Sequence, residues 1–367
     1  MTYFLSLWHT LLCICKYVNG NKIFRHFILL SGSVEVFLRR KSVIPTRKSV
    51  IPIGQYSFLQ SFNYSAWKWK LVHTLTMGVV ESKSDGTKLC VTIKLPQNAN
   101  IKVFEALSRL RSMNQEVHHL PRDFTPLHAA GDSTERYWLS CLQLPTCSHV
   151  ILVLHVATSL CQMKLAQDHP MKLSRITRCL HSFLAKCRRS SNHYLLDEKA
   201  LDGKLRANYE VANSLSRYCA YLLVSRPDLL PDTILVPKVL LQKAVGHARD
   251  KLKGFDDSWQ RIYRKLMEVP LEEPSVHGSH QRKLSVNIVE KGAKLGKKLI
   301  DQETEEHRWE ILAKIWVSLL IHIAPSPNAE AHNKYLKPGC EFISYIWALF
   351  CHCGIEKSEL WQEYCVG

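Results

Sequence analysis

The stretch that decides the fold is residues 308–354, which read RWEILAKIWVSLLIHIAPSPNAEAHNKYLKPGCEFISYIWALFCHCG. Apolar residues recur in its first part at steps of three and four, which predicts a helix with one broad buried face. The residues on that face are Trp309, Leu312, Ala313, Trp316, Leu319, Leu320 and Ile323. Because proline has no backbone N–H, Pro325 and Pro327 should end this helix at Ala324.

Two shorter helices are expected in the rest of this stretch. Asn328 can cap the first of them, and Pro338 and Gly339 turn the chain before the second. Gly354 should stop the second helix, since glycine adopts the left-handed conformation that is common at helix ends. The inward residues of that last helix are Phe342, Ile343, Ile346, Trp347, Leu349 and Phe350.

Most of the chain before this stretch also has helical spacing. Helices are predicted within residues 101–114, 149–163, 206–224, 238–252, 258–267 and 286–300. The segment 149–163 is apolar nearly all round, and its length favours a buried helix over a buried strand. These patterns predict a mainly α protein.

A small β-hairpin is expected among these helices. Between residues 89 and 95, apolar residues alternate with polar ones, which predicts a half-buried strand. Residues 74–80 are the expected partner, joined through Asp85 and Gly86. Residues 116–148 contain several prolines and a glycine, so we expect a long loop there.

Three regions are expected along the chain. Residues 1–52 form a hydrophobic N-terminal segment and basic linker, residues 53–148 a mixed region with the hairpin, and residues 149–355 a helical C-terminal domain with its signature at 308–355. The apolar runs 3–18 and 27–38 are shorter than the roughly 20 residues that span a bilayer. The basic cluster at 39–41 suits the cytosolic flank of a membrane helix.

Charge and cysteine content restrict the partners and the compartment. The chain of 367 residues has 49 Lys and Arg against 32 Asp and Glu, a formal net charge of +17 that favours anionic partners such as a membrane surface. No nucleic-acid-binding motif accompanies this charge, so we expect no nucleic acid. The 13 cysteines are odd in number and include no C-x-x-C pair, which predicts reduced thiols facing the cytosol.

Three patterns suggest chemistry, and each has a simpler explanation. Cys351, His352 and Cys353 are zinc-type ligands, but consecutive helix residues point about 100° apart and cannot converge on one ion. Cys340 at a helix start is a candidate nucleophile. Residues 292–298 are one residue too short between their glycines for a phosphate-binding loop, which favours a basic helix. We therefore expect no metal and no cofactor.

The motifs of the C-terminal stretch also carry a resemblance. They are Trp309 and Trp316, Ala324-Pro325-Ser326, Ala329 to His332, Gly339-Cys340-Glu341-Phe342, Trp347-Ala348-Leu349, and His352 to Ile355. In these motifs the chain resembles a plant protein family known as domain of unknown function 594. The resemblance implies that the membrane-embedded domain of unknown function 4220 normally precedes this part, so the chain resembles a member shortened at its N-terminus.

The resemblance also limits the candidate sites. The family has glycine where this chain has Cys340, which argues against a catalytic cysteine. It has acids where this chain has Ser159 and Ser318, and a tryptophan at Leu154, so a site built on those acids is not expected here.

The sequence therefore predicts a membrane-associated helical scaffold or interaction protein that is not an enzyme, with its folded part facing the cytosol. Its partners would be an unknown protein and an anionic membrane surface. One alternative is a soluble, cytoplasmic helical interaction module, and a distant one is a thiol-dependent enzyme using Cys340. The motif residues to examine first, more as structural residues than as a site, are Trp309, Trp316, His332, Gly339, Glu341, Phe342 and Trp347.

Overall fold

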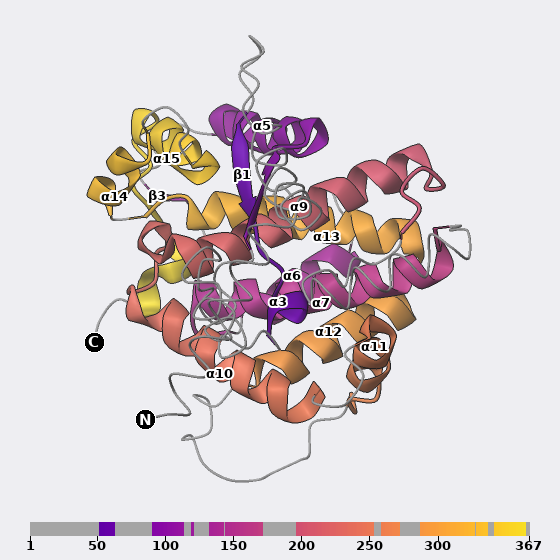
Figure 1. The fold of residues 1–367 in the computed structure, drawn as a ribbon. Coiled ribbons are helices and arrows are strands. Elements are labelled where there is room, and N and C mark those ends of the chain that lie inside the picture. The colour runs from indigo at the N-terminus through magenta and orange to yellow at the C-terminus, as the bar shows by residue number, and fades with distance from the viewer. Residues whose placement is uncertain are drawn as a thin grey trace, which may run out of the picture. The chain divides into compact units, whose positions relative to one another are not determined.

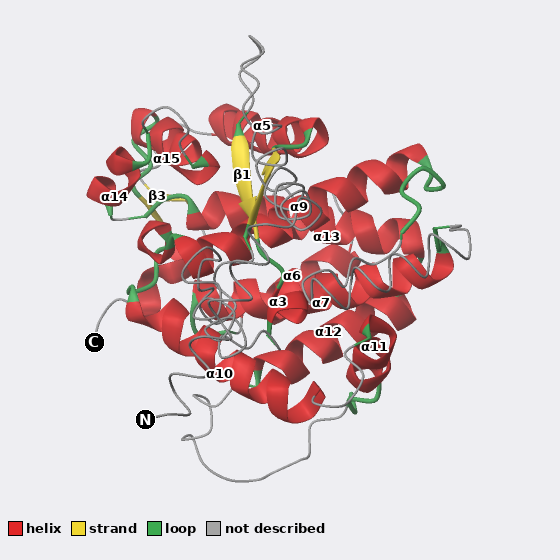
Figure 2. Ribbon diagram, viewed as in Figure 1, coloured by secondary structure: helices red, strands yellow, loops and turns green. Residues whose placement is uncertain are grey.

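Helices make up most of the structure, a computed structural model shown in Figures 1 and 2. The described residues are 51–62, 90–113, 119–120, 132–142, 144–171, 196–252, 258–271, 287–326, 328–336 and 341–364. They belong to one unit, Ile51–Gly367, and the N-terminal residues 1–50 lie outside the description. The predicted mainly α class is confirmed.

The helices predicted from apolar spacing are present. They are α5 (Gln97–Met113), α7 (Cys147–Asp168), α9 (Gly203–Ser225), α10 (Leu235–Leu252), α11 (Trp259–Met267) and α12 (Ile288–Gln302). A short 3-10 turn, η1 (Pro227–Leu229), follows α9, where Pro227 prevents the helix from continuing.

Helix α7 lies in the core, and α9 and α12 pack along it (Figure 1). Thr146 caps its N-terminus, and the Asp232 carboxylate accepts from the backbone N–H groups of Cys147 and Ser148 at 3.2 and 2.8 Å. Among the described residues it is the one helix long and apolar enough to cross a bilayer, yet 94% of that apolar window is buried inside the protein. Contact with its neighbours on all sides accounts for its apolarity.

The C-terminal stretch folds as α13 (Glu305–Ile323), α14 (Ala329–Lys334) and α15 (Phe342–His352). The predicted apolar face of α13 is fully buried, and the helix ends at Ala324. The Asn328 side chain caps α14, and Gly354 has the positive φ of 74° expected after α15. The inward placement of Leu349 is wrong: its side chain is 43% exposed, because it shares the outer face of α15 with Tyr345, one turn earlier.

Two glycines allow α12 to approach α7 closely. A Cβ atom at Gly292 would lie 2.6 Å from the Val156 Cβ, and one at Gly296 would lie 3.0 Å from a Leu160 methyl. Arg308 of α13 then binds the end of α12, donating to the carbonyl oxygens of Leu299, Ile300 and Glu303. The stretch 292–298 is therefore part of a packed basic helix, as predicted.

The strand expected near residues 89–95 pairs with a segment that was not predicted as a strand. Strand β2 (Val91–Lys94) pairs antiparallel with β1 (Pro52–Gln55), with Ile53 opposite Ile93, and the short helix α3 (Phe58–Ser61) follows β1. The expected partner, residues 74–80, lies outside the described residues. Val91 is 63% and Ile93 37% exposed, so the predicted half-burial of β2 is wrong; β1 takes the inner position against α9.

The expected long loop at 116–148 contains a helix. Helix α6 (Asp132–Leu142) lies between the proline- and glycine-containing segments, which flank it rather than interrupt it. Strand β3 (His119–Leu120) pairs in parallel with β4 (Lys357–Ser358), and the 3-10 helix η3 (Glu359–Tyr364) follows. The buried His322 imidazole binds the Ser358 hydroxyl at 2.8 Å, which fastens this C-terminal segment to α13.

Candidate functional site

Glu341 lies in a buried polar cluster between α15 and α9. Its carboxylate accepts from the Tyr221 hydroxyl at 2.9 Å and the Tyr218 hydroxyl at 3.4 Å, and its Oε1 lies 3.3 Å from Nε of Arg226. Burial, followed by the Glu341 charge, raises the pKa of both tyrosines, so they stay protonated and donate. Tyr218 also accepts from the Ile343 backbone N–H, which fixes the start of α15. This cluster joins the helices.

Among the described residues, His332 contacts α15 through Ser344 and Trp347 and makes no bond to the Glu341 carboxylate. Its Nδ1 lies 3.1 Å from the Ser344 hydroxyl, and its ring stacks on Trp347 with centroids 4.8 Å apart. Burial lowers its pKa to about 4, so the ring is neutral near pH 7. The Nε2 atom has no hydrogen-bond partner among the described residues.

The remaining motif residues are part of the core or lie outside the description. Trp316 is fully buried and donates to the Thr158 hydroxyl at 2.9 Å. The Trp309 and Tyr209 rings pack edge to face with their centroids 4.9 Å apart, and Phe342 packs against Tyr218. Gly339 and Cys340 lie outside the described residues, so the structure gives no geometry for the candidate nucleophile.

The zinc-type residues at the end of α15 are exposed. Cys351, His352 and Cys353 lie at the protein surface, whereas His322 and His332 are buried and bind serines. No group of three His, Cys, Asp or Glu side chains within the described ranges is arranged to hold a metal ion.

A further buried histidine, His155, links α7 to two neighbours. Its Nε2 accepts from the Phe58 backbone N–H at 3.1 Å, which places the ring proton on Nδ1, and Nδ1 donates to the Ser216 hydroxyl at 2.8 Å. Burial, assisted by the charge of Arg217, lowers its pKa to about 3. Both ring nitrogens are engaged, so this histidine has a structural role.

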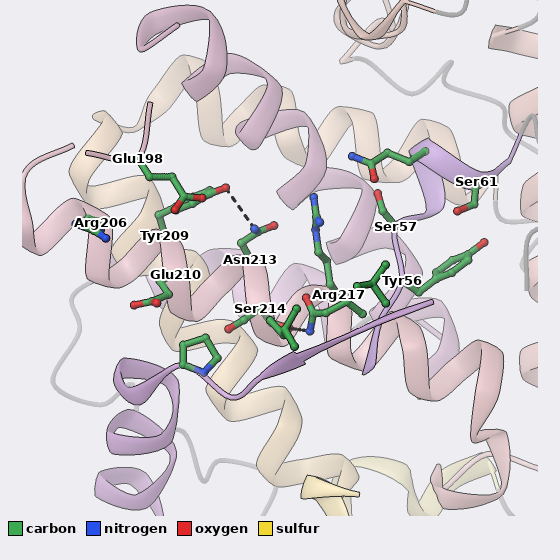
Figure 3. Close-up of a pocket in the computed structure, with 15 residues that line it drawn as sticks. Tyr56, Ser57, Ser61, Glu198, Arg206, Tyr209, Glu210, Asn213, Ser214 and Arg217 are labelled. Atoms are coloured by element: carbon green, nitrogen blue, oxygen red, sulfur yellow. Dashed lines mark hydrogen bonds between the residues drawn. The ribbon is translucent and has the colours of Figure 1, made fainter. Parts of the chain in front are cut away.

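A pocket of about 340 Å³, here called the α9 pocket, lies between α9 and the β1–α3 and β2 segments (Figure 3). Its polar lining comes from Gln55, Tyr56, Ser57, Gln60, Ser61, Glu198, Arg206, Tyr209, Glu210, Asn213, Ser214 and Arg217. Its apolar lining comes from Val91, Ile93 and Pro96. Figure 3 shows the Arg217 side chain pointing between Ser57 and Asn213.

A second, shallower hollow of about 420 Å³ lies where α12 meets α6 and is here called the basic hollow. Its charged lining residues in the described part of the chain are Arg136, Lys291, Lys294 and Lys298, all of them basic. Its apolar lining includes the buried Leu144, Val153 and Leu295 and the partly exposed Leu271. This combination of cations around apolar side chains suits a ligand with an anionic and an apolar part.

The sequence predicted α9 and α12, which line these hollows, but neither hollow. The α9 pocket needs residues from β1, α3 and β2 to lie over α9, and the β1–β2 pairing was not expected. The basic hollow needs α6, which was predicted as loop. The one signal present in the sequence was the row of lysines in α12.

Comparisons with known proteins identify one part of the chain. A search of curated proteins and a search of solved structures both found no match. Residues 301–355 match the model of a family described as a protein of unknown function, DUF594. The part of the chain that forms α13, α14 and α15 therefore carries the C-terminal signature of this family.

Proposed function

We propose that this chain is a helical interaction protein without enzymatic activity, held against the cytosolic face of an anionic membrane. The observation that carries the proposal is the basic hollow, where Lys291, Lys294 and Lys298 lie together and none of the described lining residues is acidic. Lysines near an anionic bilayer contribute about 1 kcal/mol each to binding. Three such residues would strengthen binding by about 3 kcal/mol, or roughly 100-fold.

The N-terminal segment supplies a second feature that favours membrane binding, in addition to the basic hollow. Residues 1–38 contain the two apolar runs, and the basic cluster 39–41 follows them. Stable peripheral binding takes two signals, since one apolar anchor or one basic patch gives only marginal, reversible attachment. The resemblance to the plant family, in which the membrane-embedded domain 4220 precedes this part, supports this proposal.

Two further observations support a cytosolic, non-enzymatic role. No described cysteine is in a disulfide, as expected of a chain in a reducing compartment. The polar motif residues are engaged in joining helices: Glu341 with two tyrosines and Arg226, and His332 with Ser344 and Trp347.

Vesicle flotation of the full chain tests this proposal. The chain should float with phosphatidylcholine vesicles that contain phosphatidylserine and much less with pure phosphatidylcholine. The combined variant Lys291→Gln, Lys294→Gln, Lys298→Gln should bind the anionic vesicles about 100-fold more weakly. A control variant, Lys94→Gln, Lys199→Gln, Lys357→Gln, removes the same charge from exposed lysines outside the hollow and should retain most of the binding.

Two results would overturn the proposal. Equal losses in both triple variants would mean that net charge, and not the hollow, attracts the membrane. A full chain that floats with neither vesicle would favour the alternative, a soluble helical interaction module.

A further inference from the structure

The α9 pocket contains an arginine whose donors are mostly unused. Arg217 is half-buried, and its guanidinium makes one hydrogen bond among the described residues, 3.3 Å from Nη2 to Oε1 of Gln162. It forms no ion pair with a described carboxylate, although a guanidinium has five N–H donors. Its backbone is fixed, because its carbonyl oxygen accepts from the Tyr56 N–H at 3.1 Å. The side chain is therefore held in the pocket with donors available for an anionic group.

Tyr209 supplies a second donor in the same pocket. Its hydroxyl oxygen accepts from the side-chain amides of Gln162 at 2.8 Å and Asn213 at 3.3 Å. Both of these bonds use the oxygen as acceptor, so its own proton has no acceptor among the described residues. Burial, followed by the charge of Glu198, raises the pKa of Tyr209 to about 12, so the proton is present near pH 7.

The rest of the lining restricts the ligand. Glu198 and Glu210 also line the pocket, so a dianionic phosphate group would meet stronger repulsion than a singly charged carboxylate. Glu210 already accepts from the Asn98 side chain at 2.7 Å. Val91 and Ile93 expose apolar surface on the same pocket, which suits an apolar ligand body. The volume of about 340 Å³ is enough for a small molecule.

We infer that the α9 pocket binds a small monocarboxylate with an apolar body, whose carboxylate lies against Arg217. The guanidinium donates two parallel N–H bonds to the carboxylate oxygens. The apolar body lies against Val91 and Ile93. This site is independent of the basic hollow and of membrane binding.

Calorimetric titration of the full chain with two matched pairs of probes tests this inference. Benzoate and 3-methylbutanoate should bind at millimolar or lower concentration, and their neutral amides, benzamide and 3-methylbutanamide, should bind about tenfold or more weakly. This comparison needs no variant, so it is decisive even if changes at Arg217 affect folding. Equal binding of acids and amides, or no binding of any of the four, would overturn the inference.

Variants then locate the carboxylate. Arg217→Gln should weaken benzoate binding about tenfold or more, and Arg217→Lys should weaken it less, since it keeps the charge but loses the parallel donors. Arg206→Gln removes the same charge from an exposed residue of the same pocket and should leave binding nearly unchanged. A larger loss with Arg206→Gln than with Arg217→Gln would place the anion elsewhere and contradict the assignment.

Discussion

At the scale of single residues, Glu341 is a buried charge with several partners. Replacing it by glutamine keeps its size but removes the charge that Arg226 and the two tyrosine hydroxyls face. Hydrogen bonds to charged groups contribute about 1.5–3 kcal/mol, so Glu341→Gln should lower the free energy of unfolding by that amount. Urea denaturation measures it. Glu356→Gln, at an exposed acid after the same helix, should change it little.

Unchanged stability of the Glu341→Gln variant would give Glu341 a different role. If Glu341→Gln unfolds like the parent but loses a partner that the parent captures, then Glu341 belongs to a binding site and not to a structural cluster.

Buried histidines predict how stability depends on pH. Burial lowers the pKa of His155 to about 3 and of His332 to about 4, below the value of about 6.5 for an unfolded histidine. The unfolded chain therefore binds more protons between these values, and stability should be full above pH 6.5 and fall as the pH is lowered toward 4. As the pH falls from 6.5 to 5, each histidine should lower the free energy of unfolding by about 2 kcal/mol.

Denaturation curves across this range check the prediction. The variant His155→Gln can accept from the Phe58 N–H and donate to Ser216 without titrating, so its stability should depend less on pH. A pH dependence identical to that of the parent would mean that His155 is not the neutral, buried group described above.

Residue-level prediction from the sequence succeeded where spacing alone determines burial. Trp309 and Trp316 follow helical spacing and are buried as predicted. Leu349 was misplaced because its helix has an outer face that the apolar pattern does not reveal. The surroundings of Arg217 include Ser57, which precedes α3, and Gln162 of α7, and both are far from it along the chain, so no local pattern could indicate them.

At the scale of elements, the packing of α12 on α7 depends on glycine. Alanine is about 1 kcal/mol more favourable than glycine inside a helix. Gly292→Ala should nonetheless destabilise the protein, because its Cβ would lie 2.6 Å from the Val156 Cβ and 2.9 Å from the Val153 carbonyl oxygen, atoms that cannot move easily. Thermal unfolding measures the effect.

The matched control lies in α10. A Cβ at Gly246 would have no neighbour within 4 Å, so Gly246→Ala should raise stability by up to about 1 kcal/mol. If both variants were stabilising, the close approach of α12 to α7 would be refuted.

Element prediction was better for long helices than for short or paired elements. The apolar spacing of α7, α9 and α13 extends over several turns, so these helices were predicted from the sequence. The pairing of β1 with β2 joins segments on either side of residues 56–90, and four-residue strands carry little pattern. Helix α6 was missed because prolines on both sides of it favoured a loop.

At the scale of the whole molecule, the net charge of +17 indicated an anionic partner, and the structure shows where some of that charge gathers. The sequence could not show this grouping, since Arg136 of α6 and the lysines of α12 are far apart along the chain. We expect that attachment requires this basic hollow together with residues 1–38, which lie outside the described residues.

Fractionation of cells that express four versions of the chain tests this account most directly. The versions are the full chain, a deletion of residues 1–38, the Lys291→Gln, Lys294→Gln, Lys298→Gln variant, and both changes together. The full chain should be found with membranes, each single change should release part of it, and the combined change should leave it soluble. A full chain that is already soluble, or a doubly changed chain that remains on membranes, would contradict the account.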